Sequence, residues 1–345
     1  MAQFDLKTFN PEAFGRYMEM IPKTRLNELL RSGAVRPTSQ FRDALSAQTG
    51  GNFATFPLFG RLTGKPLNYD GKTDITATNT NTYSRSVVVT GRANAWIEKD
   101  FSEDITGKAG FMSNVARQVG DYWDTVDQNI LLTILEGIYS MTGTENENFI
   151  KSHTYDISDD SESANMNIAT LNTAMQRAAG DNKSIFGLAI MHSYVATNLE
   201  NERLFKNLTV TDPSGVTRDL GMMTWNGRLV LIDDSMPVES VDTTSNLYTT
   251  YVLGNGAFDF DNVGAETPHE MVREAKTNGG QTSLVSRQRK VYAPYGISFV
   301  KDSMASDSPT DTELSTGSFW TLVNDKNDGY IDHKAIPIAR IISKG

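Results

Sequence analysis

A single amphipathic segment, from Phe111 to Met141, sets the strongest limit on how this chain can fold. Apolar residues recur in it at steps of three and four, the spacing that places side chains on one face of an α-helix. The main stripe consists of Val115, Val119, Tyr122, Val126, Ile130 and Ile134, and it is widened by Trp123, Leu131, Leu135 and Ile138. The pattern predicts one helix of about 30 residues, which is ~45 Å long at 1.5 Å per residue. Such a helix acts as a beam that crosses a whole domain.

Three aspartates of this segment, Asp121, Asp124 and Asp127, lie largely off the stripe. We therefore expect the helix to carry an outward acidic face. These carboxylates should be exposed or should meet basic groups of a neighbouring molecule.

The composition excludes several classes of protein. The 345 residues include 21% charged and 39% hydrophobic residues, an ordinary soluble globular composition. No apolar run approaches the ~20 residues of a membrane span, and the start lacks the pattern of a secretory signal. The absence of cysteine excludes disulfides and thiolate metal sites and fits a reducing cytoplasm. A net charge of -10 makes the chain a poor candidate for gripping DNA phosphates.

Two differently textured segments precede the long helix. Residues 1–52 read as an irregular arm with short helices near 11–14 and 24–31, and Gly50-Gly51 then breaks the chain. Residues 53–100 read as two long strands joined by a polar Thr/Asn tip, which predicts a projecting β-hairpin. We expect its tip to contribute little to the core of the subunit itself.

The segments after the long helix alternate between helices and strands. A second helix is predicted over 161–179, and a short one over 193–199 with Ser193 as its cap. Strands are predicted at 185–191, 228–232, 247–253 and 335–342. Asn278-Gly279-Gly280 predicts a hairpin turn between strands at 270–275 and 283–292. The whole order predicts an α+β fold.

A search for catalytic, cofactor or metal-binding patterns yields none. The four histidines, His153, His192, His269 and His333, show no metal-ligand spacing. Gly254-Asn255-Gly256 lacks the third glycine of a dinucleotide loop and reads as a turn, and the segment 324–329 fails as a calcium loop. Adjacent residues on a strand end point in opposite directions, so Asp233 and Asp234 are a poor acid/base dyad. They fit better as a strand end and turn cap before Pro237.

Three segments resemble those of tailed-bacteriophage major capsid proteins. Residues 227–237 (GRLVLIDDSMP) are similar to the family's glycine–apolar strand–aspartate–proline segment. Residues 251–258 (YVLGNGAF) resemble the strand and glycine turn that follow it, and residues 292–299 (YAPYGISF) resemble a late aromatic/proline–glycine segment. With the hairpin and the long helix, the resemblance covers roughly residues 53–342.

The resemblance implies the Hong-Kong-ninety-seven-type coat fold, shared with encapsulins. Its parts would be an N-terminal arm (1–52), an extended loop (53–100), a peripheral domain with the spine helix (101–179), an axial domain (180–270) and strands returning to the peripheral domain (271–345). The implied protein is a structural subunit and not an enzyme. It would form pentamers and hexamers in an icosahedral head that encloses double-stranded DNA without sequence-specific binding.

The resemblance also implies partners and contact residues. Only about 50 residues precede the hairpin, too few for a scaffolding prefix, so the chain is either a mature form or assembles with a separate scaffolding protein; the starting Met1 favours the latter. A portal is also expected, with a decoration protein as an optional partner. No cofactor, metal or membrane is expected. The location would be the virion, after assembly in the host bacterial cytoplasm. The candidate subunit-interface residues are Tyr69, Asp70, Asn79, Asn81, Arg85, Asp121, Asp124, Asp233 and Asp234.

Three alternatives stay open at this point. An encapsulin-type compartment shell would use the same fold. An enzyme on a mixed α/β fold would need a convergent polar site, which the sequence does not show. A phage tail or baseplate protein is disfavoured by the long central helix.

Overall fold

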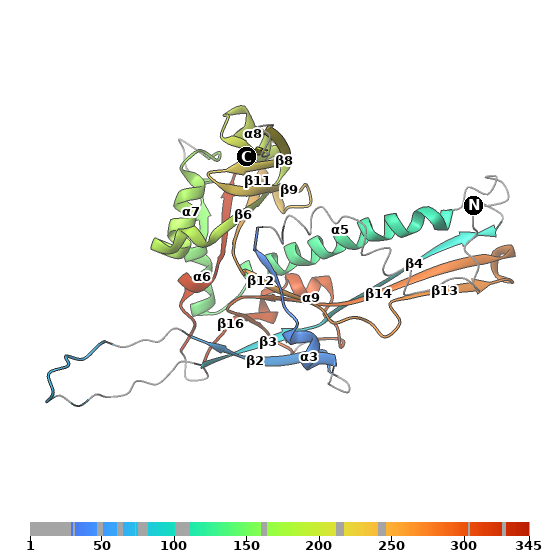
Figure 1. The fold of residues 1–345 in the computed structure, drawn as a ribbon, viewed down its shortest axis with the longest axis horizontal. Helices are drawn as coiled ribbons and strands as arrows, with labels where there is room; N and C mark the ends of the chain where they lie inside the picture. Colours follow the sequence, from blue (N-terminus) through green and yellow to red (C-terminus); the bar gives the residue numbers. More distant parts are fainter. Residues whose placement is uncertain are drawn as a thin grey trace.

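The computed structural model describes residues 29, 32–46, 51–60, 65–72, 74, 82–100, 111–159, 164–211, 217–240, 246–302, 304–325 and 329–344. Helices and sheets mix along the chain and form one elongated body, which confirms the predicted α+β class (Figure 1). The helices expected at 11–14 and 24–31 lie outside the described residues, apart from Leu29, which is helical and buried.

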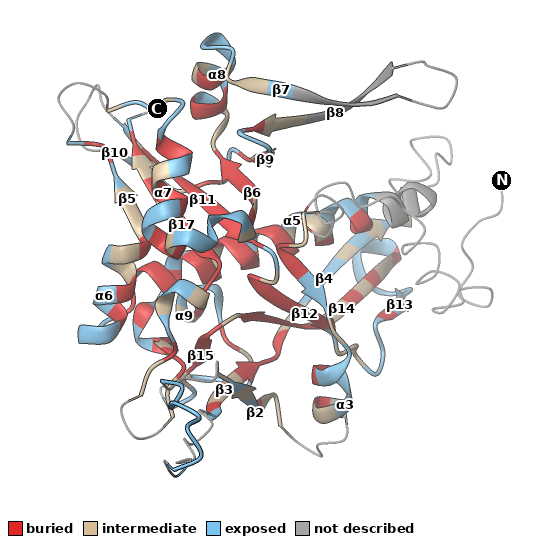
Figure 2. Cartoon of the chain, turned by 60° about the vertical axis from the view of Figure 1, so that its left-hand side comes forward, coloured by how far each residue is buried: buried red, intermediate tan, exposed pale blue. Residues whose placement is uncertain are grey.

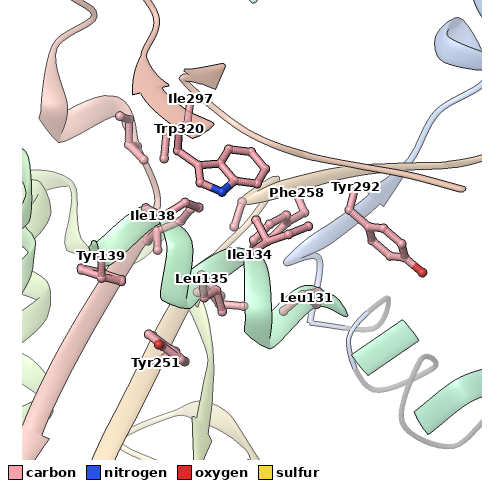
Figure 3. Close-up of a cluster of buried hydrophobic side chains, with 14 of the residues drawn as sticks. Leu131, Ile134, Leu135, Ile138, Tyr139, Tyr251, Phe258, Tyr292, Ile297 and Trp320 are labelled. Carbon is pink, nitrogen blue, oxygen red and sulfur yellow. The ribbon is translucent and has the colours of Figure 1, made fainter. Parts of the chain in front are cut away.

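The long helix α5 runs from Phe111 to Tyr139, which confirms the strongest prediction from the sequence. Its C-terminal half lies at the centre of the largest core (Figure 3). There Leu131, Ile134, Leu135 and Ile138 meet aromatic side chains of four strands: Tyr251, Phe258, Tyr292 and Trp320. Burying one face along a helix provides most of its stability, because isolated helices are marginal in water.

The predicted apolar stripe of α5 is wrong at one position. Tyr122 is exposed, and the neighbouring Trp123 takes the buried position. The Trp123 indole donates a hydrogen bond to the Ser286 hydroxyl at 3.0 Å, which satisfies its polar atom inside the core. The Tyr122 ring instead stands edge-on to Trp96, with ring centroids 5.3 Å apart.

A glycine lets α5 pass very close to helix α9 (Asp311–Ser315). A Cβ atom on Gly137 would lie 2.1 Å from the Leu314 carbonyl oxygen and 2.6 Å from the Trp320 indole nitrogen. Because backbone cannot move aside as a flexible side chain can, only glycine fits this crossing.

Helix α5, called the spine helix from here on, lies along a five-stranded sheet in which three strands pair with β14 (Gln281–Pro294). One half of β14 pairs with β13 (His269–Glu274) and β4 (Thr90–Lys99), and its other end pairs with β12 (Phe258–Asn262). Strand β1 (Val35–Pro37) adds in parallel to β12, and helix α3 (Gln40–Ser46) follows it. The hairpin predicted around 278–280 is confirmed: Asn278 and Gly279 have φ values of 52° and 77°.

A second sheet of eight strands forms the other end of the molecule. Its order is β5 (Thr154–Asp156), β17 (Ile338–Ser343), β11 (Asn246–Gly254), β6 (Phe186–Met191), β9 (Arg228–Ile232), β8 (Thr217–Trp225) and β7 (Phe205–Thr211), with β10 (Val238–Ser240) on β11. The strands predicted at 185–191, 228–232 and 247–253 are confirmed as β6, β9 and β11. The last strand, expected at 335–342, begins only at Ile338 as β17, because His333–Ala335 forms a 3-10 helix. Helices α7 (Thr170–Ala179) and α8 (Ser193–Asn201) pack on it. Buried residues gather where this sheet meets α5 (Figure 2).

The predicted hairpin is confirmed in part. Strands β2 (Phe53–Phe59) and β3 (Thr82–Val88) pair antiparallel, with Phe53 opposite Val88 and Phe59 opposite Thr82. Its second arm ends at Val88, however, because Thr90–Lys99 forms β4 and pairs with β14 over ten residues. The polar run 76–82 lies outside the described residues except for Thr82. Next to β3, β15 (Ile297–Phe299) pairs with β16 (Trp320–Leu322).

Three local predictions need correction. Helix α7 begins at Thr170 instead of 161, because the Asn167 side chain accepts hydrogen bonds from the Ala169 and Thr170 amides and starts it there. Helix α8 is capped by His192, whose Nδ1 accepts from the Tyr194 amide at 3.1 Å, and not by Ser193. Helix α6 (Thr144–His153) was not predicted, because only three of its ten residues are buried.

The register of α5 makes a measurable prediction. Replacing Ile130 by alanine should lower the free energy of unfolding by about 2–5 kcal/mol, because its buried side chain would leave a cavity. Asp121→Asn on the exposed side of the same helix is the matched control and should change stability by less than ~0.5 kcal/mol. Urea unfolding of both variants checks this, and equal losses would contradict the register.

Candidate subunit-interface surfaces

Residues 65–72 and 74, which follow β2, project from the body on the side opposite the long β4–β14–β13 sheet (Figure 1). All of them are exposed, and together with the end of β2 they are called the projection. Tyr69 is 90% exposed and Leu67 48%, and Phe59 at the end of β2 is 76% exposed. Three large apolar side chains in water on one projection are an unusual cost, which contact with another surface would remove.

Two candidate interface residues, Tyr69 and Asp70, lie on this projection. The Asp70 carboxylate accepts a hydrogen bond from the Lys72 amide at 2.9 Å, which shapes a local turn. Asn79 and Asn81 lie outside the described residues.

Arg85 is placed differently: it lies inside the molecule at the base of the projection. Its guanidinium donates to the Asp259 carboxylate at 2.6 Å and to the Ala293 carbonyl at 2.7 Å, and the side chain is only 7% exposed. Arg36 of β1 donates to the other oxygen of the same carboxylate at 2.9 Å. The Asp259 carboxylate of β12 therefore binds both Arg85 of β3, at the base of the projection, and Arg36 of β1.

The five-stranded sheet has one face toward α5 and one face away from it. Trp96 contacts Tyr122 of α5, so the alternation of a strand turns Ala95 and Ile97 to the opposite face. Ala95 and Ile97 are exposed there. Residues opposite them on β14 are Val285 and Ser283, and Val272 of β13, which pairs with Ser283, is also exposed. This outer face exposes Ala95, Ile97 and Val272, and the ion pair between Arg287 and Glu270 lies on the same face.

The acidic face predicted for α5 is only partly present. Asp121 is exposed and Asp124 is half-buried, but Asp127 is buried and forms an ion pair with the buried Lys290 of β14. Asp127 follows Trp123 by four residues and precedes Ile130 by three, so it falls on the apolar face. Burial and the nearby Asp127 carboxylate raise the pKa of Tyr292 well above its usual range.

Asp233 and Asp234 point in opposite directions, as expected of a strand end. Asp233 is buried: its carboxylate accepts from the Ser235 amide at 2.9 Å and from the Gln128 side chain of α5. The exposed Asp234 accepts from the Ser193 amide at 3.3 Å, and hydrogen bonding from Ser193 lowers the pKa of its carboxyl. The predicted turn cap is confirmed, and Asp233 additionally joins the eight-stranded sheet to the spine helix.

Within the described ranges, no three histidine, cysteine or acidic side chains gather at metal-binding distance. No local pattern predicts that His153 and His333 meet, but His153 Nε2 and His333 Nδ1 lie 3.2 Å apart. His333 lines a surface hollow of about 710 Å³. None of the helices described is long and apolar enough to cross a membrane.

No family model matches the chain. The major capsid protein of Bacillus phage SPP1 is 26% identical over 317 residues, which cover 91% of this chain and 92% of that protein. Among solved structures, the capsid of Ralstonia phage GP4 superposes with a TM-score of 0.57 at 11% identity, over 90% of this chain and 87% of that one. The cyanophage Pam1 capsid subunit gives 0.55 at 12% identity, over 100% and 99%.

The chain has the fold of tailed-phage major capsid proteins. The resemblance seen in three sequence segments is therefore confirmed over almost the whole length. Sequence and fold together make this chain a structural subunit of a phage capsid, with the virion as its location.

Proposed function

We propose that this chain forms the shell of a phage head by joining into pentamers and hexamers that close into an icosahedron around double-stranded DNA. The observation that carries this is the exposed apolar projection on a capsid fold: Phe59, Leu67 and Tyr69 need a surface that their own subunit does not provide. Relatives of the same fold come from phage capsids.

The shape of the subunit supports contacts that run head to tail. The projection leaves one end of the body, and the long β4–β14–β13 sheet extends at the other (Figure 1). A contact between two different surfaces of identical subunits closes into a ring when its rotation is a whole fraction of a turn. We infer that the projection of one subunit lies on the outer sheet face around Ile97 of its neighbour. Tyr69 and Asp70 are then interface residues.

The other candidate residues divide into two groups. Asp121 and Asp234 are exposed, and Asp124 is half-buried, so we propose that they face neighbouring subunits. Arg85 and Asp233 are buried within the subunit, so we propose that they act on the interface by positioning the projection and the axial part. Asn79 and Asn81 remain proposed contacts.

The proposed division into parts agrees with the sheets only in part: β5 and β17 fall in the peripheral part and the returning strands but pair within the eight-stranded sheet. Residues 1–52 and 53–100 are the arm and loop, 101–179 the peripheral part, 180–270 the axial part and 271–345 the returning strands. Strand pairing favours moving two of these limits. β4 belongs with the peripheral sheet, and the axial part ends near 257, because β12 and β13 pair with β14.

The net negative charge of the chain fits a shell protein that does not bind the enclosed DNA tightly. With a net charge of -10, enclosed DNA would be tolerated without sequence-specific binding. We propose a separate scaffolding protein, a portal and an optional decoration protein as partners, with assembly in the host cytoplasm. The alternative, an encapsulin-type compartment, would be favoured by a neighbouring gene for a cargo protein with a docking peptide. The SPP1 relative supports the phage role.

Electron microscopy of the purified protein tests the proposal. We expect closed shells with five-fold vertices, either from the chain alone or with its scaffolding protein co-expressed. A strictly monomeric state under every condition, including co-expression, would contradict shell formation. Open tubes alone would contradict the formation of pentamers.

A further inference from the structure

Two histidines from distant parts of the chain meet where α6 ends and β17 begins. His153 is the last residue of α6, and His333 opens the short 3-10 helix η4 (His333–Ala335) that leads into β17. His153 is 2% exposed, and its ring stacks on Phe149 with centroids 4.3 Å apart. His333 is half-buried and lines the 710 Å³ hollow with Glu145 and Asp332.

The hydrogen bonds fix where the protons are. His153 Nδ1 lies 2.6 Å from the Ile338 carbonyl oxygen, which can only accept, so Nδ1 carries a proton. In the neutral ring Nε2 then has a lone pair, and it lies 3.2 Å from His333 Nδ1. His333 Nδ1 must therefore donate.

Protonation of His153 would disturb the pair. If His153 Nε2 takes up a proton while His333 Nδ1 keeps its own, two N–H groups face each other at 3.2 Å, and neither nitrogen can accept a hydrogen bond. We propose that the His153–His333 pair is an acid-sensitive latch: it holds η4 against α6 while His153 is neutral, and it releases η4 and widens the hollow when His153 is protonated. This inference does not depend on shell assembly.

The surroundings of His153 favour its neutral form. Burial lowers its pKa to about 4, and a charge on His333 would lower it further. Hydrogen bonding to the Ile338 and His333 backbone and the Asp332 carboxylate oppose this shift. Other groups near the pair are Glu145 in the hollow and Tyr139 of α5, whose hydroxyl donates to the His153 carbonyl oxygen at 3.4 Å. The Arg340 guanidinium lies over the Tyr139 ring.

The lowered pKa of His153 determines how the stability of the folded chain changes with pH. His153 titrates near 6.5 when unfolded and near 4 when folded, so unfolding takes up a proton below pH 6.5. The stabilising contribution is complete above pH 6.5 and is lost as the pH falls toward 4. Linkage through this one group should raise the unfolding equilibrium constant about sevenfold between pH 6 and pH 5.

Hydrogen exchange of the full-length chain tests the latch. The amides of Ala335 and Ile336 bond to the carbonyls of Asp332 and His333, so they report on η4. We expect their protection, corrected for intrinsic rates, to fall at least tenfold between pH 6.5 and pH 4.5. In His153→Gln, which keeps a donor and an acceptor but does not titrate in this range, protection should not change with pH. His269→Gln, at a second buried histidine in the β13–β14 hairpin, is the matched control and should behave as the wild type.

Direct titration of each histidine, by mass spectrometry of C2-hydrogen exchange, needs no variant and serves if His153→Gln does not fold. We expect an apparent pKa for His153 at least one unit below 6.5. A value near 6.5, protection of η4 that is constant down to pH 4.5, or equal loss in wild type and His153→Gln would each overturn the latch.

Discussion

Replacing Asp259 by alanine should lower the free energy of unfolding by about 3–5 kcal/mol, because it leaves the buried Arg85 guanidinium without its counter-charge. The loss is large because Arg85 is fixed by three strands. Arg85 belongs to β3, and its guanidinium donates hydrogen bonds to the Asp259 carboxylate of β12 and to the Ala293 carbonyl oxygen of β14. The same change removes the Arg36 contact of β1. Urea unfolding of the full-length subunit measures the effect.

Asp311→Ala is the matched control for this prediction. Its carboxylate pairs with Arg92 at 2.5 Å, but the side chain is 71% exposed, and exposed pairs contribute about 0–1 kcal/mol. A second variant separates the lost attraction from the stranded charge. Combining Asp259→Ala with Arg85→Met should recover part of the loss, because no buried charge then remains. If Asp259→Ala and Asp311→Ala cost the same, Arg85 is not held as described.

The elements that sequence reasoning located best are those whose apolar pattern is long or sharply bounded. The helix around Ile130, the strands 228–232 and 247–253, and the turn at Asn278-Gly279 all lie where the sequence placed them. In each case local spacing or turn chemistry is sufficient, because the signal comes from residues that are neighbours in the sequence.

The errors arise where distant residues decide the outcome. Thr90–Lys99 alternates like a hairpin arm, yet β14, almost 200 residues away, captures it as a ten-residue partner. Asp127 reads as a surface carboxylate until Lys290 is placed beside it. His153 and His333 are 180 positions apart, and no local pattern could predict their contact. Helix α6 has too little apolar surface to be predicted from periodicity, since it buries only Asn146, Phe149 and His153.

The candidate interface residues show the same division. Exposure of Tyr69 and Asp70 could be expected from the polar, turn-rich character of their segment. The burial of Arg85 and Asp233 could not be expected from their own segments. Arg85 is neutralised by Asp259 of another sheet, and Asp233 accepts a hydrogen bond from Gln128 of α5. A charged residue next to apolar residues in a strand can therefore lie either on the surface or inside the protein in an ion pair or hydrogen bond.

The projection gives the second large prediction, in which stability and assembly separate. Changing both Leu67 and Tyr69 to serine should alter subunit stability by less than ~0.5 kcal/mol, because both side chains are exposed. Each contact between neighbours should nevertheless weaken by at least ~2 kcal/mol, the cost typical of a buried aromatic anchor in an interface. That corresponds to roughly a 30-fold rise in the subunit concentration needed for assembly.

The test compares thermal unfolding of the subunit with the yield of closed particles across a concentration series. Ile168→Ser is the matched control, because Ile168 is 68% exposed before α7, away from the projection, and its change should leave both readouts unaltered. Particle yield unchanged in the double variant would show that the projection does not dock on a neighbour. Unfolding at much lower temperature would show that Leu67 and Tyr69 belong to the core of their own subunit. A fall in particle yield with unchanged unfolding is the one outcome that a surface built for contact between copies requires, because only the assembled state then buries these side chains.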